Sequence, residues 1–184
     1  MAEEQLLRRL SAVLVADMVG YSRLMEIDEA GTLTRLKALR RELIDPQIHR
    51  HRGRIVKTTG DGMLVEFDSV AEAVQSAVDI QRGLGERNLS VPEDRQILFR
   101  IGINLGEIII EGSDIYGNGV NVAARLEGLA EPGGICISGT VYDQIENILS
   151  LGYQDLGERQ VRIFPDRYAV TPSGCNRMRR PPRG

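Results

Sequence analysis

The sequence predicts an α+β protein, an α/β sandwich in which helices pack on a mainly antiparallel sheet. Helical and strand patterns alternate along the chain, and two β-hairpins interrupt that alternation. The 184 residues suffice for one domain of ordinary size with a tail; 42% are hydrophobic and only 4% aromatic. We therefore expect a single core that is built mainly from Leu, Ile and Val.

The first expected strand is the apolar run LSAVLVAD, which starts at Leu10 and ends in Asp17. A weakly helical segment follows it. Residues 32–44 then place leucines on one helical face, which predicts an amphipathic helix. Pro46 lies shortly after the expected end of this helix.

Residues 53–67, GRIVKTTGDGMLVEF, predict a β-hairpin. Its turn is expected around Asp61 and the glycine that follows, because Asp and Gly both tolerate positive φ. Ser69 starts the next amphipathic helix, and Glu72 three residues later completes a capping box.

The second half of the chain predicts another hairpin, a helix that follows a glycine-rich segment, and further short elements. The hairpin spans residues 97–111 and is expected to turn near residues 104–106, where Asn and Gly occur. The later elements are expected as a helix over 120–129, a strand over 134–138, a short helix over 139–145 and a strand within 159–170.

Composition narrows the class of protein. Residues 1–170 are expected to form one domain, and residues 171–184, with little to bury, a disordered tail. The net charge of −3 does not suggest nucleic-acid binding, and no apolar run is long enough for a membrane segment. Two cysteines do not make a disulfide framework, so we expect a soluble, cytoplasmic protein. His49 and His51, in a basic stretch, are expected on the surface.

Two aspartates are candidates for chemistry. Asp17 ends the first expected strand, and Asp61 lies on the expected hairpin turn. If that strand pairs with the hairpin, both carboxylates meet at one sheet edge, beside a helix start that suits phosphate. Two hard oxygen ligands in that position describe a magnesium–phosphate site. A plain turn-forming role for Asp61 is the alternative.

Three motifs together resemble the catalytic domain of class III adenylate/guanylate cyclases. They are VADMVGYSRLM, GRIVKTTGDGMLVEF and FRIGINLGEIIIEGSDIYGNGVNVAARLE, in this order. The resemblance covers residues 10–138 and continues more weakly to residue 170. It implies a ferredoxin-like βαββαβ core and a lyase reaction in which the ribose 3′-hydroxyl attacks the α-phosphorus of a nucleoside triphosphate and pyrophosphate leaves.

The resemblance also implies two metal ions per site, Mg²⁺ or Mn²⁺. By the family pattern Asp17 and Asp61 hold them, assisted by the backbone carbonyl of Met18. Backbone N–H groups around Tyr21 and Ser22 are expected to bind the terminal phosphates.

Four further positions match residues of the family that contact substrate. Lys57 and Asp114 match the base-reading pair, and this combination favours ATP over GTP, because Lys can donate to adenine N1 and Asp can accept from the 6-amino group. Asn121 and Arg125, spaced i, i+4, are expected to orient the ribose and to stabilise charge on the α-phosphate. A guanylate cyclase is the alternative within the family.

The C-terminal part departs from the family pattern. A phosphate-binding lysine is usual near the last strand, whereas Arg162 is the nearest cation here. Because the chain carries both the metal-binding and the base-reading sets, the resemblance implies a head-to-tail homodimer with shared active sites. A catalytically silent nucleotide-binding or dimerisation module is the alternative from another class. A regulatory domain is possible outside this chain.

Overall fold

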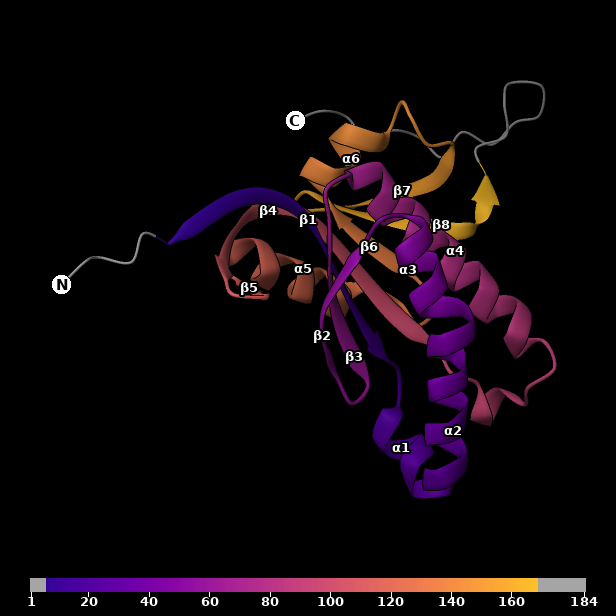
Figure 1. Cartoon of the computed structure of the whole chain (residues 1–184). Coiled ribbons are helices and arrows are strands. Elements are labelled where there is room, and N and C mark those ends of the chain that lie inside the picture. Colours follow the sequence, from indigo (N-terminus) through magenta and orange to yellow (C-terminus); the bar gives the residue numbers. More distant parts are fainter. Residues whose placement is uncertain (1–5, 169–184) are drawn as a thin grey trace, which may run out of the picture.

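The computed structural model describes residues 6–168, and these form an α+β fold around one eight-stranded sheet (Figure 1). The strand order is β2-β3-β1-β4-β6-β8-β7, with β5 paired to the outer part of β4. The β4–β6 pair is parallel, whereas the other pairs of this sheet are antiparallel. The predicted fold class is confirmed. The predicted tail over residues 171–184 lies outside the described residues.

The strands are β1 (Leu7–Met18), β2 (Arg54–Thr59), β3 (Gly62–Phe67), β4 (Phe99–Glu111), β5 (Asp114–Tyr116), β6 (Ile135–Ser138), β7 (Leu151–Gly157) and β8 (Gln160–Tyr168). The helices are α1 (Tyr21–Ile27), α2 (Glu29–Leu39), a π-helical turn (Arg40–Ile44), α3 (Asp45–Arg50), α4 (Val70–Asn88), a 3₁₀ turn (Glu93–Arg95), α5 (Asn118–Leu129) and α6 (Gly139–Ile145). Within residues 6–168, no helix is long and apolar enough to cross a membrane.

Helices cover both faces of the sheet unequally (Figure 1). Helices α2, α3, α4 and α6 pack on one face, where the larger core contains mostly Leu, Ile, Val and Ala. Helix α5 packs on the other face over a small cluster that includes Val13 and Ile108. Several valines of this second face, among them Val15 and Val56, are only partly buried. The α5 face is therefore the more open one.

The hairpin of residues 53–67 is confirmed, with one difference at its turn. Thr59 pairs with Gly62, so the two turn residues are Gly60 and Asp61. Neither has positive φ, although the sequence favoured an Asp–Gly turn that uses it. Ser69 caps α4 as predicted, because its side chain accepts a hydrogen bond from the N–H of Glu72 at 3.3 Å.

The second predicted hairpin is wrong, since β4 continues unbroken from Phe99 to Glu111. The residues that suggested a turn contact α5 instead. A Cβ on Gly102 would lie 2.2 Å from the backbone nitrogen of Glu127. The Asn104 amide is buried and donates to the carbonyl of Gly119 at 3.0 Å. These residues therefore permit close helix packing rather than chain reversal.

The predicted helix end before Pro46 is also wrong. Helical structure continues to Arg50, through the π-helical turn and into α3, with Pro46 in the first turn of α3. Proline lacks an N–H and clashes with the carbonyl four residues earlier. The wider π-helical turn, in which Asp45 N–H bonds to Arg40 O, accommodates both effects without ending the helix.

His51 is a further correction. His49 is exposed as predicted, but His51 is buried between two carboxylates of α4. Its Nδ1 lies 2.6 Å from Glu72 Oε2 and its Nε2 lies 2.8 Å from Asp79 Oδ2. The basic stretch around His51 suggested a solvated helix end. Glu72 and Asp79 are too far from it in the sequence for a local pattern to predict the contact.

Candidate active site

The two candidate metal ligands meet at the end of the β1–β3 pair. Asp17 lies opposite Gly62 in the antiparallel register, and Asp61 immediately precedes that glycine. The N–H of Met18 donates to the carbonyl of Asp61 at 2.9 Å and to Asp17 Oδ1 at 3.0 Å. This shared donor holds the end of β1 against the hairpin turn. The structure therefore brings together the two carboxylates that the sequence expected at one sheet edge.

The carboxyl group of Asp17 has a raised pKa. Its pKa is raised from 3.8 to about 6, first by burial and then by the hydrogen bond and negative charge of Asp61. The Met18 N–H and the positive charge of Arg100 act in the opposite direction. Two acids in contact repel each other when both are ionised, so this position favours the binding of positive charge.

Two charged residues that the sequence reading missed surround this pair. Arg100 lies opposite Asp17 in β4 and donates to the carbonyl of Ala130 at 3.0 Å. Glu127 of α5 is half-buried; its pKa is raised by burial and by the negative charge of Asp17 and Asp61, against the effect of Arg100. Arg100 is a lone charged residue in the apolar run of residues 99–103, and this pattern could have marked it as a candidate site residue.

Tyr21 and Ser22 form the first turn of α1, directly after Gly20, whose φ is 64°. Gly20, at the N-cap, provides no side-chain hydrogen bond to this helix start. The Tyr21 hydroxyl points at the hairpin turn, because a Cβ on Gly60 would lie 3.6 Å from it. The two residues thus lie beside Asp61, while their binding to phosphate stays a prediction.

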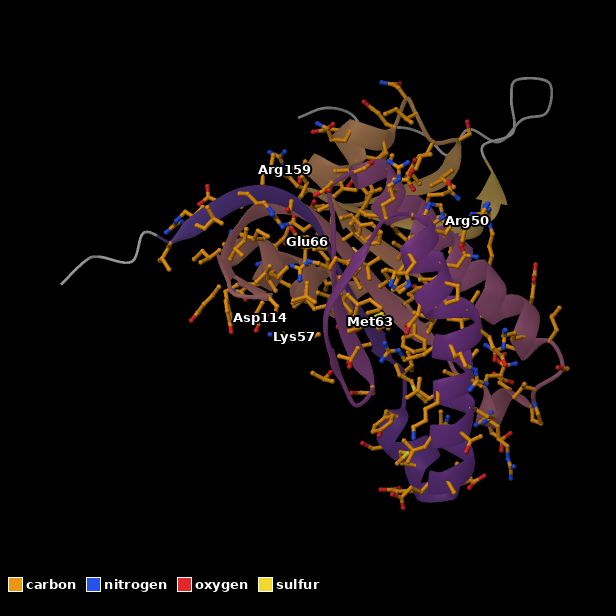
Figure 2. All side chains as sticks on the ribbon, in the orientation of Figure 1. Arg50, Lys57, Met63, Glu66, Asp114 and Arg159 are labelled. Atoms are coloured by element: carbon orange, nitrogen blue, oxygen red, sulfur yellow. The ribbon has the colours of Figure 1, made fainter. Side chains whose placement is uncertain are left out.

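Lys57 and Asp114, predicted to read the base, are adjacent in the structure (Figure 2). Lys57 Nζ lies 3.2 Å from Asp114 Oδ2 and 5.3 Å from the ring centre of Tyr116. A hydrogen bond from Tyr116, the N–H of Ile115 and Lys57 lower the pKa of Asp114 against a smaller opposing effect of burial. Tyr116 is a member of this cluster that the sequence reading did not single out.

Asn121 and Arg125 are both exposed on α5. Arg125 and Glu127 are two residues apart, which is about 200° around a helix. Glu127 faces the aspartates, so Arg125 points away from them into solvent. Within residues 6–168, no hydrogen bond or ion pair connects Asn121 or Arg125 to the aspartates. Within a single subunit, these two predicted residues therefore do not contact the Asp17–Asp61 pair.

Arg162 also lies apart from that pair. It is in β8, and β4 and β6 separate this strand from β1. Its guanidinium is 3.1 Å from Glu131 Oε1 and donates to Gln154 at 3.2 Å. Its predicted contact with phosphate stays a prediction.

The metal-binding potential of one chain rests on the two aspartates. Among residues 6–168, no group of three or more His, Cys, Asp or Glu side chains could hold a metal ion. Magnesium commonly uses one or two protein carboxylates and completes its shell with water and substrate phosphates. Asp17 and Asp61 fit this pattern if the substrate supplies further ligands.

Comparisons with known proteins identify the family. The family model of the adenylate and guanylate cyclase catalytic domain matches residues 9–169. A putative adenylate cyclase 3 from Rhizobium meliloti is 46% identical over 183 residues, which is 99% of this chain and 31% of the relative. An adenylate cyclase from Streptomyces coelicolor is 32% identical over 70% of this chain and 32% of its own length. The chain thus spans about a third of these relatives.

Solved structures agree with this match. The adenylate/guanylate cyclase/hydrolase from Silicibacter pomeroyi is 48% identical, with a TM-score of 0.79, over 85% of this chain and 95% of that one. The adenylyl cyclase CyaB from P. aeruginosa is 22% identical and supports the fold alone, with a TM-score of 0.76 over 90% of this chain and 99% of that one. The motifs, the fold and these matches show that the chain belongs to the family of adenylate and guanylate cyclase catalytic domains.

Proposed function

We propose that this domain is an adenylate cyclase, which converts ATP to 3′,5′-cyclic AMP and pyrophosphate at the interface of a homodimer. The convergence of Asp17 and Asp61, in a chain of the cyclase family, is the observation that carries the proposal. Relatives named adenylate cyclases and the Lys57–Asp114 pair support ATP rather than GTP as the substrate.

Divalent cations, Mg²⁺ or Mn²⁺, fit the Asp17–Asp61 pair. The two carboxylates offer hard oxygen ligands, and their mutual repulsion is relieved by positive charge. In our proposal the carbonyl of Met18 is a further ligand. Two such ions would lower the pKa of the ribose 3′-hydroxyl and neutralise charge on the triphosphate.

In our proposal, residues of both subunits position ATP around this pair. From the second subunit, Lys57 donates to adenine N1 and Asp114 accepts from the 6-amino group. Their mutual ion pair leaves two N–H groups on Lys57 and free lone pairs on Asp114, so both can still contact a base. Backbone N–H groups near Tyr21 and Ser22 bind terminal phosphates, and Arg100 adds positive charge beside Asp17.

Asn121 and Arg125 act in our proposal from the second subunit, in a head-to-tail dimer. Both are exposed, and Arg125 points away from the aspartates of its own chain. Tyr116 in β5 and Leu129 in α5 expose 44% and 46% of their surface. Exposed apolar side chains of this size are suited to burial against a second copy. There Arg125 stabilises charge on the α-phosphate, and Asn121 orients the ribose.

The test is to incubate the purified protein with ATP or GTP, with Mg²⁺ or Mn²⁺, and to identify products by mass. We expect cyclic AMP from ATP and its loss in Asp61→Asn, which keeps the backbone contact to Met18. Asp68→Ala is the matched control, because Asp68 is an exposed aspartate that ends the same hairpin. Cyclic GMP as the main product would overturn the substrate assignment. No cyclic product from a dimeric protein would favour a silent nucleotide-binding module.

A further inference from the structure

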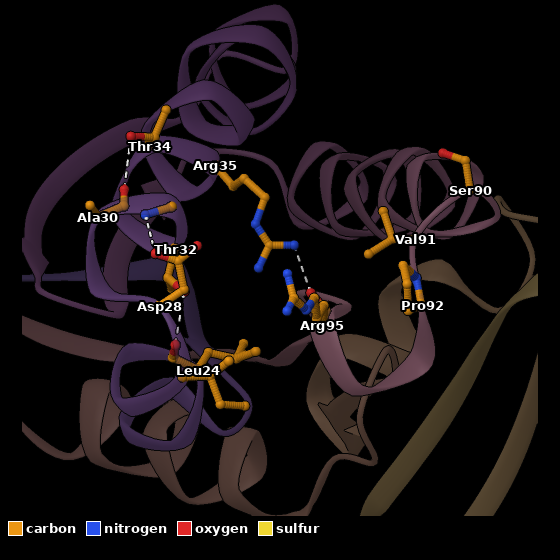
Figure 3. Close-up of a pocket in the computed structure, with 12 residues that line it drawn as sticks. Leu24, Asp28, Ala30, Thr32, Thr34, Arg35, Ser90, Val91, Pro92 and Arg95 are labelled. Atoms are coloured by element: carbon orange, nitrogen blue, oxygen red, sulfur yellow. Dashed lines mark hydrogen bonds between the residues drawn. The ribbon is translucent and has the colours of Figure 1, made fainter.

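A pocket of about 510 Å³ lies apart from the predicted substrate residues, between the α1–α2 segment and the connection from α4 to β4 (Figure 3). Small-molecule sites typically have volumes of about 300–1,000 Å³. Ile27, Val91 and Pro92 contribute accessible apolar surface to its lining, and Leu24, which also lines it, is almost fully buried. Ile27 is a large apolar side chain that remains 50% exposed at this pocket.

Two arginines give the pocket a positive charge. Arg35 and Arg95 both line it, and Arg35 Nη1 donates to the backbone carbonyl of Arg95 at 2.7 Å (Figure 3). Within residues 6–168, neither guanidinium forms an ion pair with a carboxylate. Asp28 is the acidic residue of the lining, and its carboxylate already caps α2 by accepting from the N–H of Gly31 at 3.0 Å. Two guanidinium groups therefore line a pocket whose acidic residue, Asp28, does not pair with them and caps α2 instead.

We propose that this pocket binds a small amphiphilic anion. A carboxylate or phosphate head group would bind Arg35 and Arg95, since guanidinium groups form strong, often bidentate hydrogen bonds with either. The apolar body would lie against Ile27, Val91 and Pro92. The combination of unpaired cations with an apolar wall selects a ligand that carries both features, rather than a free inorganic anion or a neutral apolar molecule.

Both walls of the pocket lead directly to the candidate active site. Helix α1 follows Asp17 through the turn at Gly20, and the other wall leads from Arg95 into β4 and Arg100. Between them, the N–H of Val19 donates to the carbonyl of Leu98 at 2.8 Å. A ligand that bridges the walls therefore restrains the segments that carry Asp17 and Arg100. The regulatory consequence of binding rests on the proposed function, whereas binding itself does not.

Binding is tested by titrating the protein with octanoate, octyl phosphate, octanol and inorganic phosphate while recording methyl NMR spectra. We expect saturable shifts of the Leu24, Ile27 and Val91 methyl groups with the two amphiphilic anions, and none with octanol or phosphate at equal concentrations. Arg95→Met should weaken binding about tenfold through loss of a charge-assisted contact. This variant keeps the backbone carbonyl that Arg35 uses. Lys37→Met, an exposed change on α2 outside the lining, should bind like the wild type.

Three results would overturn the site: no saturable shift with either anion, equal affinity in Arg95→Met, or equal binding of octanol. Comparison of octanoate with octyl phosphate identifies which head group the arginines prefer. The regulatory part predicts that octanoate changes the rate of cyclic AMP formation in the wild type and not in Arg95→Met. An unchanged rate at saturating octanoate contradicts regulation. A protein without cyclase activity contradicts the proposed function, and the titration still decides the site.

Discussion

Glu66 is a buried carboxylate on the α5 face of the sheet, outside the candidate site. It is 3% exposed and accepts hydrogen bonds from Arg9, Arg54 and Ser11. Burial raises its pKa, but these three donors outweigh burial and lower the pKa below the ordinary 4.5. Because the folded-state pKa is depressed, the stabilisation is present above the unfolded-state pKa and is lost as pH falls through the folded-state value.

We predict that Glu66→Gln destabilises the domain by about 2–3 kcal/mol at pH 7, because both arginines lose a charged acceptor. The loss should shrink as pH falls below about 4.5, through the lower folded-state pKa at which the wild-type carboxylate becomes protonated. Urea unfolding of both proteins across this range measures the difference. A difference that is constant with pH would mean that the charge of Glu66 contributes nothing to stability.

Tyr116 offers a second test at the scale of single residues. Its ring lies beneath the Lys57 ammonium, and its hydroxyl bonds to Asp114. We expect Tyr116→Phe to keep the ring contact and to lose part of the orientation of Asp114. Selectivity for ATP over GTP, measured as the ratio of kcat/KM values, should then fall about fivefold, as expected for one hydrogen bond.

Tyr153→Phe is the matched control for this change. It also removes one hydrogen bond, from its hydroxyl to the carbonyl of Leu149 at 3.0 Å, but β7 is at the far end of the sheet. Its selectivity should be that of the wild type. Equal selectivity in the Tyr116 variant and the wild type would exclude a role of the hydroxyl in base recognition.

At the scale of elements, the sequence predicted those whose signals are local. Capping by Ser69 and the hairpin around Asp61 depend on residues a few positions apart, and both formed as expected. The sequence misjudged β4 and the helix around Pro46, because tertiary contact decides both. Gly102 and Asn104 resemble turn residues until α5 is placed against them. The same limit applies to the candidate site. The sequence predicted the residues that lie in recognisable motifs, whereas Arg100, Glu127 and Tyr116 were recognised only from their neighbours in the folded structure.

The contact between β4 and α5 can be tested with two glycines. A Cβ on Gly102 would lie 2.4 Å from the Ala123 carbonyl and nearer still to the Glu127 nitrogen, so Gly102→Ala should destabilise the domain by about 1–3 kcal/mol. Gly128→Ala is the control, because open space surrounds that position on α5. It should stabilise the domain by about 0.5–1 kcal/mol through helix propensity. Thermal unfolding measures both. Equal and small effects would contradict the close packing that positions α5.

At the scale of the whole molecule, the fold divides the predicted catalytic residues into two sets. Asp17 and Asp61 converge at the end of β1, while Asn121 and Arg125 face solvent from α5. Both sets lie on elements of the more open side of the sheet, where Val15 and Val56 are only partly buried. A second copy in head-to-tail arrangement would bring the two sets together twice, once at each shared site.

This arrangement predicts complementation between two inactive variants. Asp17→Ala and Arg125→Ala should each lack cyclase activity as homodimers, the latter because loss of such a donor costs about 10²–10³ in rate. Random pairing of an equal mixture makes half of the dimers mixed, and each mixed dimer holds one intact site of two. The mixture should therefore regain about one quarter of wild-type activity. Asp17→Ala mixed with Asp61→Ala is the control and should stay inactive, because every site then lacks one aspartate. If subunit exchange is demonstrated and the first mixture stays inactive, Arg125 does not act across the dimer.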